Sequence, residues 1–344
     1  MSARLRVGVV DDSAFNRVCI REWLQSTEDL ELDSSLANGE EALRTWLTAP
    51  PDVAIVDLEM PKLDGLTLVR LLMAKRSFPI VVFSSYSSSD NVVRALEAGA
   101  LRFVAKPDSL VDADATQLRA ELLSAVREAA RVDVSRLARA RTELPSLVPG
   151  GKSPRALATT LSVLVTGTGG PQAMFEMVSG SLRLQGRAWV ALMDMPGKYI
   201  YSLATRLGAK TTLDVVLLDP GEPLLENTLY LVPREMRLVA ERDANGIVLH
   251  QSYVGESGET ANSLLQSLAS AIGANTSAAL LTGGGSDGVL GLEAVSTAGG
   301  DVYVQNAHDA VVPELVLNAQ AAGVPARTCS LAELRSLLAA SERV

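Results

Sequence analysis

The sequence predicts two consecutive α/β domains, each built on a parallel β-sheet covered by helices on both faces. Short apolar runs alternate with helical patterns through residues 6–130, and a second alternation of the same kind starts near residue 161. Such alternation is typical of βαβ units. The length of 344 residues agrees with two domains, since one domain usually takes roughly 100–200 residues.

The first alternation predicts five strands and five helices. Most of the strands are continuous apolar runs, as expected for strands that are buried on both faces of a sheet. We expect strands at 6–10, 30–34, 53–56, 80–83 and 103–105, and helices at 14–25, 40–47, 66–75, 89–97 and 115–130.

The second alternation is longer and includes an antiparallel segment. The sequence Asp-Ala-Asn-Gly at 243–246 is a turn signal, which predicts a hairpin around residues 228–250. We expect strands at 161–165, 188–193, 213–218, 228–232, 237–240, 247–250, 278–281 and 302–305, and helices at 172–179, 199–207, 263–272, 289–298 and 314–322.

A proline- and glycine-containing stretch separates the two alternations. The periodic pattern weakens over 131–155, which indicates a linker. We therefore predict a first domain at 1–125, a linker at 126–158 and a second domain at 159–344. The alternative is an ordered arm that packs between the domains.

Composition excludes several classes of function. The net charge of −9 disfavours nucleic acid as a partner, because phosphate binding needs a concentrated basic surface. The two cysteines, Cys19 in a predicted helix and Cys329 in a predicted loop, form no metal or disulfide pattern. The longest uncharged run, 262–286, is interrupted by polar residues and glycines, so we expect no membrane insertion. We see no signal peptide and expect a cytoplasmic protein.

Polar residues gather at the predicted carboxyl ends of the first domain's strands, where open parallel sheets bind ligands. Three carboxylates meeting there would repel one another unless a cation lay among them, and oxygen ligands favour Mg²⁺. A lysine and a hydroxyl would neutralise a transferred phosphoryl group. The residues are Asp11 and Asp12 after the first strand, Asp57 after the third, Ser84 and Ser85 at the fourth, and Lys106 after the fifth.

These residues resemble the receiver domain of bacterial two-component response regulators over residues 4–125. The similar motifs are Asp11-Asp12-Ser13, Asp-Leu-Glu-Met-Pro-Lys-Leu-Asp-Gly at 57–65, Ser84-Ser85 and Phe-Val-Ala-Lys-Pro at 103–107, in the family's order. The resemblance implies a flavodoxin-like fold and phosphorylation by a histidine kinase with Mg²⁺ as cofactor.

The resemblance also implies a role for each matching residue. For Phe103, a plain role as a core residue is as good an interpretation as the role of aromatic switch that the resemblance implies. The implied roles are Asp57 as phosphoacceptor; Asp12, Asp57 and the backbone carbonyl of Glu59 as Mg²⁺ ligands; Asp11 as a ligand through water; Ser84 as switch hydroxyl; Phe103 as aromatic switch; and Lys106 as phosphate partner.

Three loops at predicted strand ends carry a second candidate site, at 165–171, 193–196 and 281–292. Glycine-rich turns between a strand and a helix expose backbone N–H groups, although such turns are common. Together the loops resemble the catalytic domain of the chemotaxis-receptor protein-glutamate methylesterases over residues 159–325. The order of receiver, linker and effector is also similar, which implies a three-layer α/β second domain.

The sequence departs from that family at two of three catalytic positions. The family's serine nucleophile is replaced by Gly167 and its histidine base by Asp194, whereas Asp287 remains. Glycine offers no nucleophile, and an aspartate does not replace an imidazole that takes and returns a proton near neutral pH. We therefore expect no Ser-His-Asp hydrolysis, and we expect the loop glycines to serve tight turns.

Several other residues are candidates to replace the lost groups, and each has a simpler structural interpretation. They are His308 and His250 as bases, Thr166 and Thr168 as nucleophiles, Ser286 in a Gly-x-Ser-x-Gly pattern, and Asp194 with Asp287 as a carboxylate pair or cation site.

Two functions follow from these observations. The first is a phosphorylation-controlled response regulator of a chemosensory system, whose effector domain has lost hydrolysis and binds a chemoreceptor, the kinase or another signalling protein. The alternative is an active protein-glutamate methylesterase with an altered mechanism. A DNA-binding regulator is disfavoured, because no helix-turn-helix pattern follows the first domain.

Overall fold

The computed structural model describes residues 4–85, 89–107, 115–132, 156–244, 246–252 and 259–339. The chain divides into two compact units, residues 1–141 and 142–344. Most of the predicted linker, residues 133–155, lies outside the described residues.

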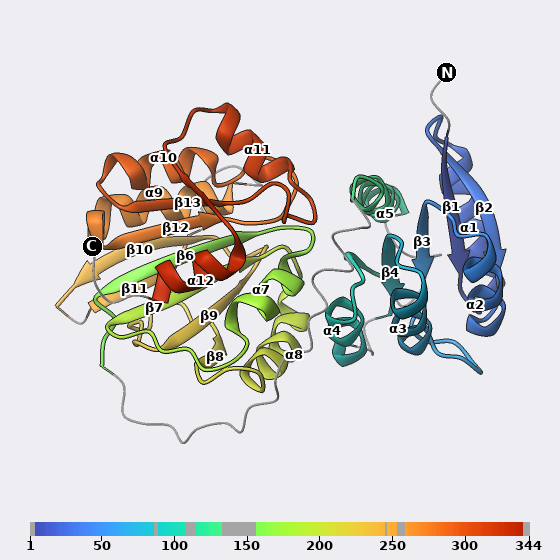
Figure 1. Cartoon of the computed structure of the whole chain (residues 1–344), viewed down its shortest axis with the longest axis horizontal. Coiled ribbons are helices and arrows are strands. Elements are labelled where there is room, and N and C mark those ends of the chain that lie inside the picture. The colour runs from blue at the N-terminus through green and yellow to red at the C-terminus, as the bar shows by residue number, and fades with distance from the viewer. Residues whose placement is uncertain are drawn as a thin grey trace. The chain divides into compact units, whose positions relative to one another are not determined.

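The first unit contains a parallel five-stranded sheet with strand order β2-β1-β3-β4-β5 (Figure 1). The chain moves one way from β1 to β2 and the other way from β2 to β5, so right-handed crossovers place α1 opposite α2, α3 and α4. Helix α5 contacts α1. The elements are β1 (Leu5–Val10), α1 (Ala14–Gln25), β2 (Leu30–Leu36), α2 (Gly39–Thr48), β3 (Val53–Val56), α3 (Gly65–Lys75), β4 (Ile80–Ser84), α4 (Ser89–Glu97), β5 (Arg102–Ala105) and α5 (Ala115–Ala130).

Polar caps begin the first three helices of this unit. Ser13, Asn38 and Asp64 each accept a hydrogen bond from the backbone N–H three residues later. Such caps satisfy amide groups that have no partner inside the helix. Because α1 and α3 follow strands after short loops, their caps also fix where the residues between strand and helix lie.

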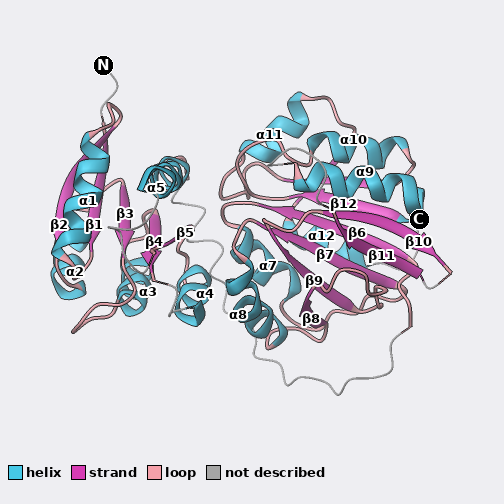
Figure 2. Ribbon diagram, turned by 180° about the vertical axis from the view of Figure 1, so that it is seen from behind, coloured by secondary structure: helices cyan, strands magenta, loops and turns pink. Residues whose placement is uncertain are grey.

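The second unit contains a parallel seven-stranded sheet with strand order β14-β13-β12-β6-β7-β9-β8. Helices α9, α10 and α11 cover one face, and α7 and α8 cover the other (Figures 1 and 2). The elements are β6 (Thr160–Thr166), α7 (Gly170–Val178), β7 (Arg187–Met193), α8 (Gly197–Gly208), β8 (Asp214–Leu217), β9 (Thr228–Pro233), β10 (Leu238–Asp243), β11 (Gly246–Gln251), α9 (Thr260–Ile272), the 3-10 turn η2 (Gly273–Asn275), β12 (Thr276–Leu280), α10 (Val289–Thr297), β13 (Asp301–Gln305), α11 (Glu314–Ala321), β14 (Arg327–Cys329) and α12 (Leu331–Ala339).

The predicted fold class is confirmed: both units are α/β folds with parallel sheets. The predicted hairpin is narrower than expected, because β9 joins the parallel sheet, and the described hairpin consists of β10 paired antiparallel with β11. Asn245, in the predicted turn, lies outside the described residues. In the described part of the chain, no helix is both long and apolar enough to cross a membrane.

Two elements near the C-terminus were missed by the sequence analysis. Strand β14 has only three residues, two of them exposed, so it carries no apolar run. Cys329, expected in a loop, ends this strand and is buried, and both cysteines are free. Helix α12 follows directly and contacts α7.

Candidate functional site

The acidic residues of the first unit converge at the carboxyl ends of β1 and β3. Carboxylate oxygens of Asp11, Asp12 and Asp57 all lie within 4.8 Å of one another. Asp11 and Asp57 are buried, whereas Asp12 is exposed. Three like charges this close favour a bound cation, and hard carboxylate oxygens suit Mg²⁺. The residues present therefore fit the expected metal.

Lys106, directly after β5, supplies the cationic side chain of this cluster. Its Nζ lies 2.7 Å from Asp11 Oδ2 and 2.5 Å from Asp57 Oδ2, and the side chain is buried. Burial raises the pKa of Asp57, while the charge of Lys106 and its hydrogen bond oppose that rise. The lysine thus holds two carboxylates that would otherwise repel each other.

Helix α1 provides further contacts to Asp11 that the sequence analysis missed. The side-chain amide of Asn16 donates to both carboxylate oxygens at 3.3 Å, and the N–H of Ser13 donates to Oδ1 at 2.9 Å. Arg17 donates to the backbone carbonyls of Asp11 and Asp12. The available signal was the position of Asn16 and Arg17, one helical turn after the acid pair.

The remaining predicted residues of this site lie on neighbouring strand ends. Ser84 is the last residue of β4 and is fully buried, and Phe103 is half-buried on β5. The N–H of Glu59 donates to Asp57 Oδ1 at 3.2 Å, and the Glu59 carboxylate accepts from the Ser85 hydroxyl at 2.7 Å. The loops after β3 and β4 are thereby tied together beside Asp57.

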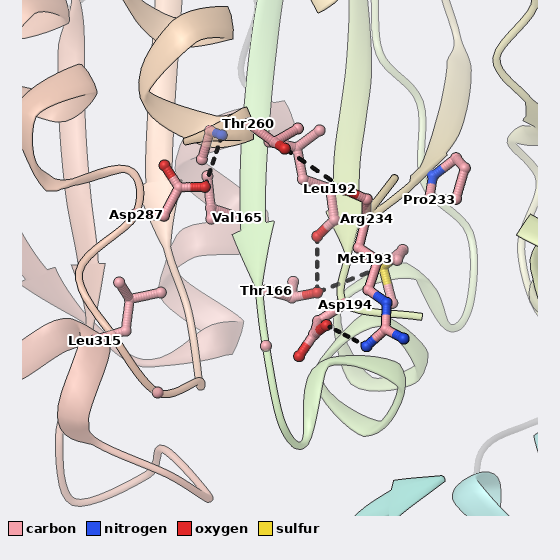
Figure 3. A pocket seen from close by; sticks show the side chains of 13 residues that line it. Val165, Thr166, Leu192, Met193, Asp194, Pro233, Arg234, Thr260, Asp287 and Leu315 are labelled. Atoms are coloured by element: carbon pink, nitrogen blue, oxygen red, sulfur yellow. Dashed lines mark hydrogen bonds and ion pairs between the residues drawn. The ribbon is translucent and has the colours of Figure 1, made fainter. Parts of the chain in front are cut away.

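The second unit has a pocket of about 300 Å³ at the carboxyl ends of β6, β7 and β9 (Figure 3). The start of α9, the loop after β12 and α11 complete its walls. None of its described lining residues is a serine, cysteine or histidine. They are Val165, Thr166, Gly167, Leu192, Met193, Asp194, Pro233, Arg234, Thr260, Ala261, Gly284, Asp287 and Leu315.

Gly167, at the expected nucleophile position, lies against the backbone of the facing loop. A Cβ atom built on Gly167 would lie 2.8 Å from the Cα of Gly283, and one built on Gly283 would lie 2.9 Å from the Cα of Gly167. The N–H of Gly167 also donates to the carbonyl of Thr282 at 2.8 Å. A side chain at position 167 would therefore require the two loops to move apart.

Asp194, at the expected base position, forms an ion pair with Arg234. Its Oδ1 lies 3.5 Å from a guanidinium nitrogen of Arg234, and both side chains are partly exposed (Figure 3). The sequence analysis did not single out Arg234, although a charged residue directly after the buried strand β9 was a signal. The pocket thus has a paired anion and cation where a proton-transferring base would stand.

Asp287, the remaining triad position, binds the start of α9. Its two carboxylate oxygens accept from the N–H groups of Ala261 and Asn262, each at 2.9 Å. Anionic groups stabilise helix N-termini, where the first amides have no intrahelical partner. Asp287 therefore has a structural role that needs neither serine nor histidine.

The other candidate replacements are engaged or distant from the pocket. Thr166 donates to the carbonyl of Leu192 at 2.9 Å, and Thr168 is buried and does not line the pocket. Three further residues do not line the pocket: Ser286 and His308 are exposed, and His250 pairs with Glu241 across the β10–β11 hairpin.

Each of the two units matches a known protein family. The response regulator receiver domain family matches residues 7–115, and the CheB methylesterase family matches residues 162–338. A protein named protein-glutamate methylesterase/protein-glutamine glutaminase 1, from Myxococcus xanthus (strain DK1622), is 32% identical over 98% of this chain and 97% of its own length. Another from the same organism, numbered 5, is 35% identical over 97% of each chain.

A solved structure is also similar to the second unit. The crystal structure of the Thermotoga maritima CheB methylesterase catalytic domain is 22% identical, covers 52% of this chain and 96% of that chain, and has a TM-score of 0.48. The family matches and the near full-length similarity to the curated relatives lead to one conclusion: the chain belongs to the family of response regulators in which a receiver domain precedes a CheB methylesterase domain.

Proposed function

We propose that this protein is a phosphorylation-controlled response regulator whose CheB-type domain acts by binding another protein, without Ser-His-Asp hydrolysis. Asp57 accepts the phosphoryl group, and the second domain transmits the resulting change to its partner. The arrangement of residues in the two sites supports the two halves of the proposal separately.

The acidic pocket supports phosphoryl transfer to Asp57. A carboxylate oxygen of Asp57 attacks phosphorus on a phosphohistidine, the O–P bond forms, and the N–P bond breaks as its electrons return to the imidazole. Lys106 lies 2.5 Å from that carboxylate and neutralises charge on the transferred group. Bound Mg²⁺, held by Asp12, Asp57 and the Glu59 carbonyl with Asp11 through water, would add charge neutralisation.

The observation that carries the effector half is the close approach of Gly167 and Gly283. No hydroxyl stands at position 167, and the Cβ of any side chain there would lie 2.8 Å from the Gly283 Cα unless the two loops separated. Asp194 is paired with Arg234, so the neighbouring position holds an ion pair and no imidazole. With nucleophile and base both gone, only binding and backbone donors remain.

The expected partners follow from this family. We propose a chemosensory histidine kinase as phosphodonor and a chemoreceptor or another signalling protein as the output partner, in the cytoplasm. The pocket of about 300 Å³ is then a binding site for part of that partner.

Phosphorylation is tested on the full chain with Mg²⁺ and acetyl phosphate or beryllofluoride. We expect a covalent adduct with acetyl phosphate by intact mass and beryllofluoride binding by ¹⁹F NMR, both absent in Asp57→Asn. Asp219→Asn, the same change at an exposed carboxylate of the second unit, is the matched control and should retain both. Absence of any Asp57-dependent adduct would overturn the receiver half.

The alternative function, an active methylesterase, is favoured by the names of the relatives. Release of radiolabelled methanol from methylated receptor membranes, with and without phosphodonor, separates the two functions. We expect no release above background. Release that disappears in a folded Asp287→Ala variant would establish an altered hydrolase and overturn the binding-only proposal.

A further inference from the structure

We propose that Asn16 is a positioning residue for the metal site, because it holds the Asp11 carboxylate in the orientation that Mg²⁺ binding requires. This inference rests on the Mg²⁺-dependent phosphorylation proposed above. It assigns a role to a residue on α1 that is neither an expected metal ligand nor a contact of Asp57.

The geometry places the Asn16 amide directly on Asp11. Its Nδ2 lies 3.3 Å from each carboxylate oxygen, so the amide bridges both of them. Asn16 is half-buried and Asp11 is 1% exposed, so bulk water competes weakly for this carboxylate. Asn16 lies five residues after Asp11, so the contact is local to the connection between β1 and α1.

The contacts of Asp11 show why an additional anchor matters. A carboxylate has about four acceptor positions. The Ser13 N–H occupies one on Oδ1 at 2.9 Å, and Lys106 occupies one on Oδ2 at 2.7 Å. The Asn16 amide contacts both oxygens at 3.3 Å, so these four contacts use the acceptor positions, and a metal-bound water would replace one of the two long Asn16 contacts while the other still orients the carboxylate. Without Asn16, Lys106 would be the dominant side-chain partner and would draw the carboxylate toward itself.

Residues that orient a metal ligand typically change metal affinity by about 10–100-fold when removed. We expect the lower end here, because the Asn16 contacts are long for hydrogen bonds and partly exposed. Replacing the Asn16 side chain should leave the backbone at the start of α1 unchanged. The α1 cap is formed by the N–H of Asn16 and the hydroxyl of Ser13, so it does not depend on the Asn16 side chain.

The test is Mg²⁺ titration of the full-length protein by calorimetry. Asn16→Leu should weaken Mg²⁺ binding about tenfold, whereas Gln25→Leu, which removes an exposed amide at the other end of α1, should leave it unchanged. Asn16→Gln, which keeps a donor amide, should recover part of the affinity. At saturating Mg²⁺, acetyl phosphate should phosphorylate Asn16→Leu to the wild-type extent.

Each outcome has a defined meaning. If wild type binds no Mg²⁺, the proposed receiver function fails. If wild type binds Mg²⁺ and Asn16→Leu binds it with the same affinity, only the role of Asn16 is overturned. If Asn16→Leu fails to fold by circular dichroism, the comparison of Asn16→Gln with Asn16→Ala decides: equal affinities of those two variants would also overturn it.

Discussion

Asp287 and Asn262 fasten the starts of two helices to each other. Asp287 Oδ1 accepts the N–H of Asn262 on α9, and Asn262 Oδ1 accepts the N–H groups of Gly288 and Gly291 at the start of α10, all at 2.9 Å. Because this exchange satisfies amides at both helix starts, the presence of Asp287 does not by itself indicate hydrolysis.

Replacing Asp287 should therefore affect stability even where no reaction is catalysed. We expect Asp287→Ala to lower the free energy of unfolding of the second domain by about 1–2 kcal/mol, since two helix-terminal amides lose their acceptors. Urea denaturation followed through buried Trp189 provides the measurement. Glu293→Ala, an exposed change on α10, is the control; equal stabilities of the two variants would contradict the capping role.

Restoring the serine should not restore an enzyme. Gly167→Ser places a Cβ against the Gly283 backbone, so we expect a loss of about 1–3 kcal/mol in unfolding free energy and no methanol release. Gly284→Ser is the matched control, because its nearest neighbour would be a flexible Glu314 oxygen at 3.8 Å. A Gly167→Ser protein as stable as wild type would show that the two loops separate easily.

The acid cluster predicts that removing one carboxylate stabilises the metal-free receiver and weakens its binding of Mg²⁺. In EDTA, Asp12→Asn should raise the free energy of unfolding of the receiver by about 1 kcal/mol, because it removes one of three mutually repelling carboxylates. The same variant should lose most of the stabilisation that Mg²⁺ confers on wild type in thermal unfolding. Glu28→Gln removes a charge elsewhere and serves as control; an Asp12→Asn protein that Mg²⁺ stabilises as strongly as wild type would speak against this site.

An ion pair between Asp29 and Arg127 predicts a pH dependence in the receiver. Two hydrogen bonds of 2.7 and 2.9 Å from Arg127 lower the pKa of Asp29 to about 2. A lowered folded-state pKa contributes stability above the unfolded value of about 3.9, and this contribution is lost as the pH falls toward about 2.

Asp29→Asn should consequently cost less than about 1 kcal/mol at pH 7, because the pair is partly exposed to solvent. The difference from wild type should shrink between about pH 4 and about pH 2 in denaturant titrations. A difference of undiminished size at the acid end of that range would show that the substitution acts through packing and not through charge.

Much of the architecture was accessible from local patterns. Alternating apolar runs and helical periods predicted the central strands of both sheets, because a strand buried on both faces must be continuously apolar. The same patterns missed β14 and α12, since β14 is short and mostly exposed and therefore leaves no apolar run.

The order of residues specifies which chemical groups the two sites contain: three carboxylates and a lysine in the receiver, and neither serine nor histidine at two positions of the CheB-type domain. The contacts that those groups make depend on the packing of the folded chain. That packing closed Gly167 against Gly283, paired Asp194 with Arg234, and placed Asp287 on α9. These contacts join segments far apart in the chain, and their distances depend on how strands and helices pack, which no local pattern of residues records.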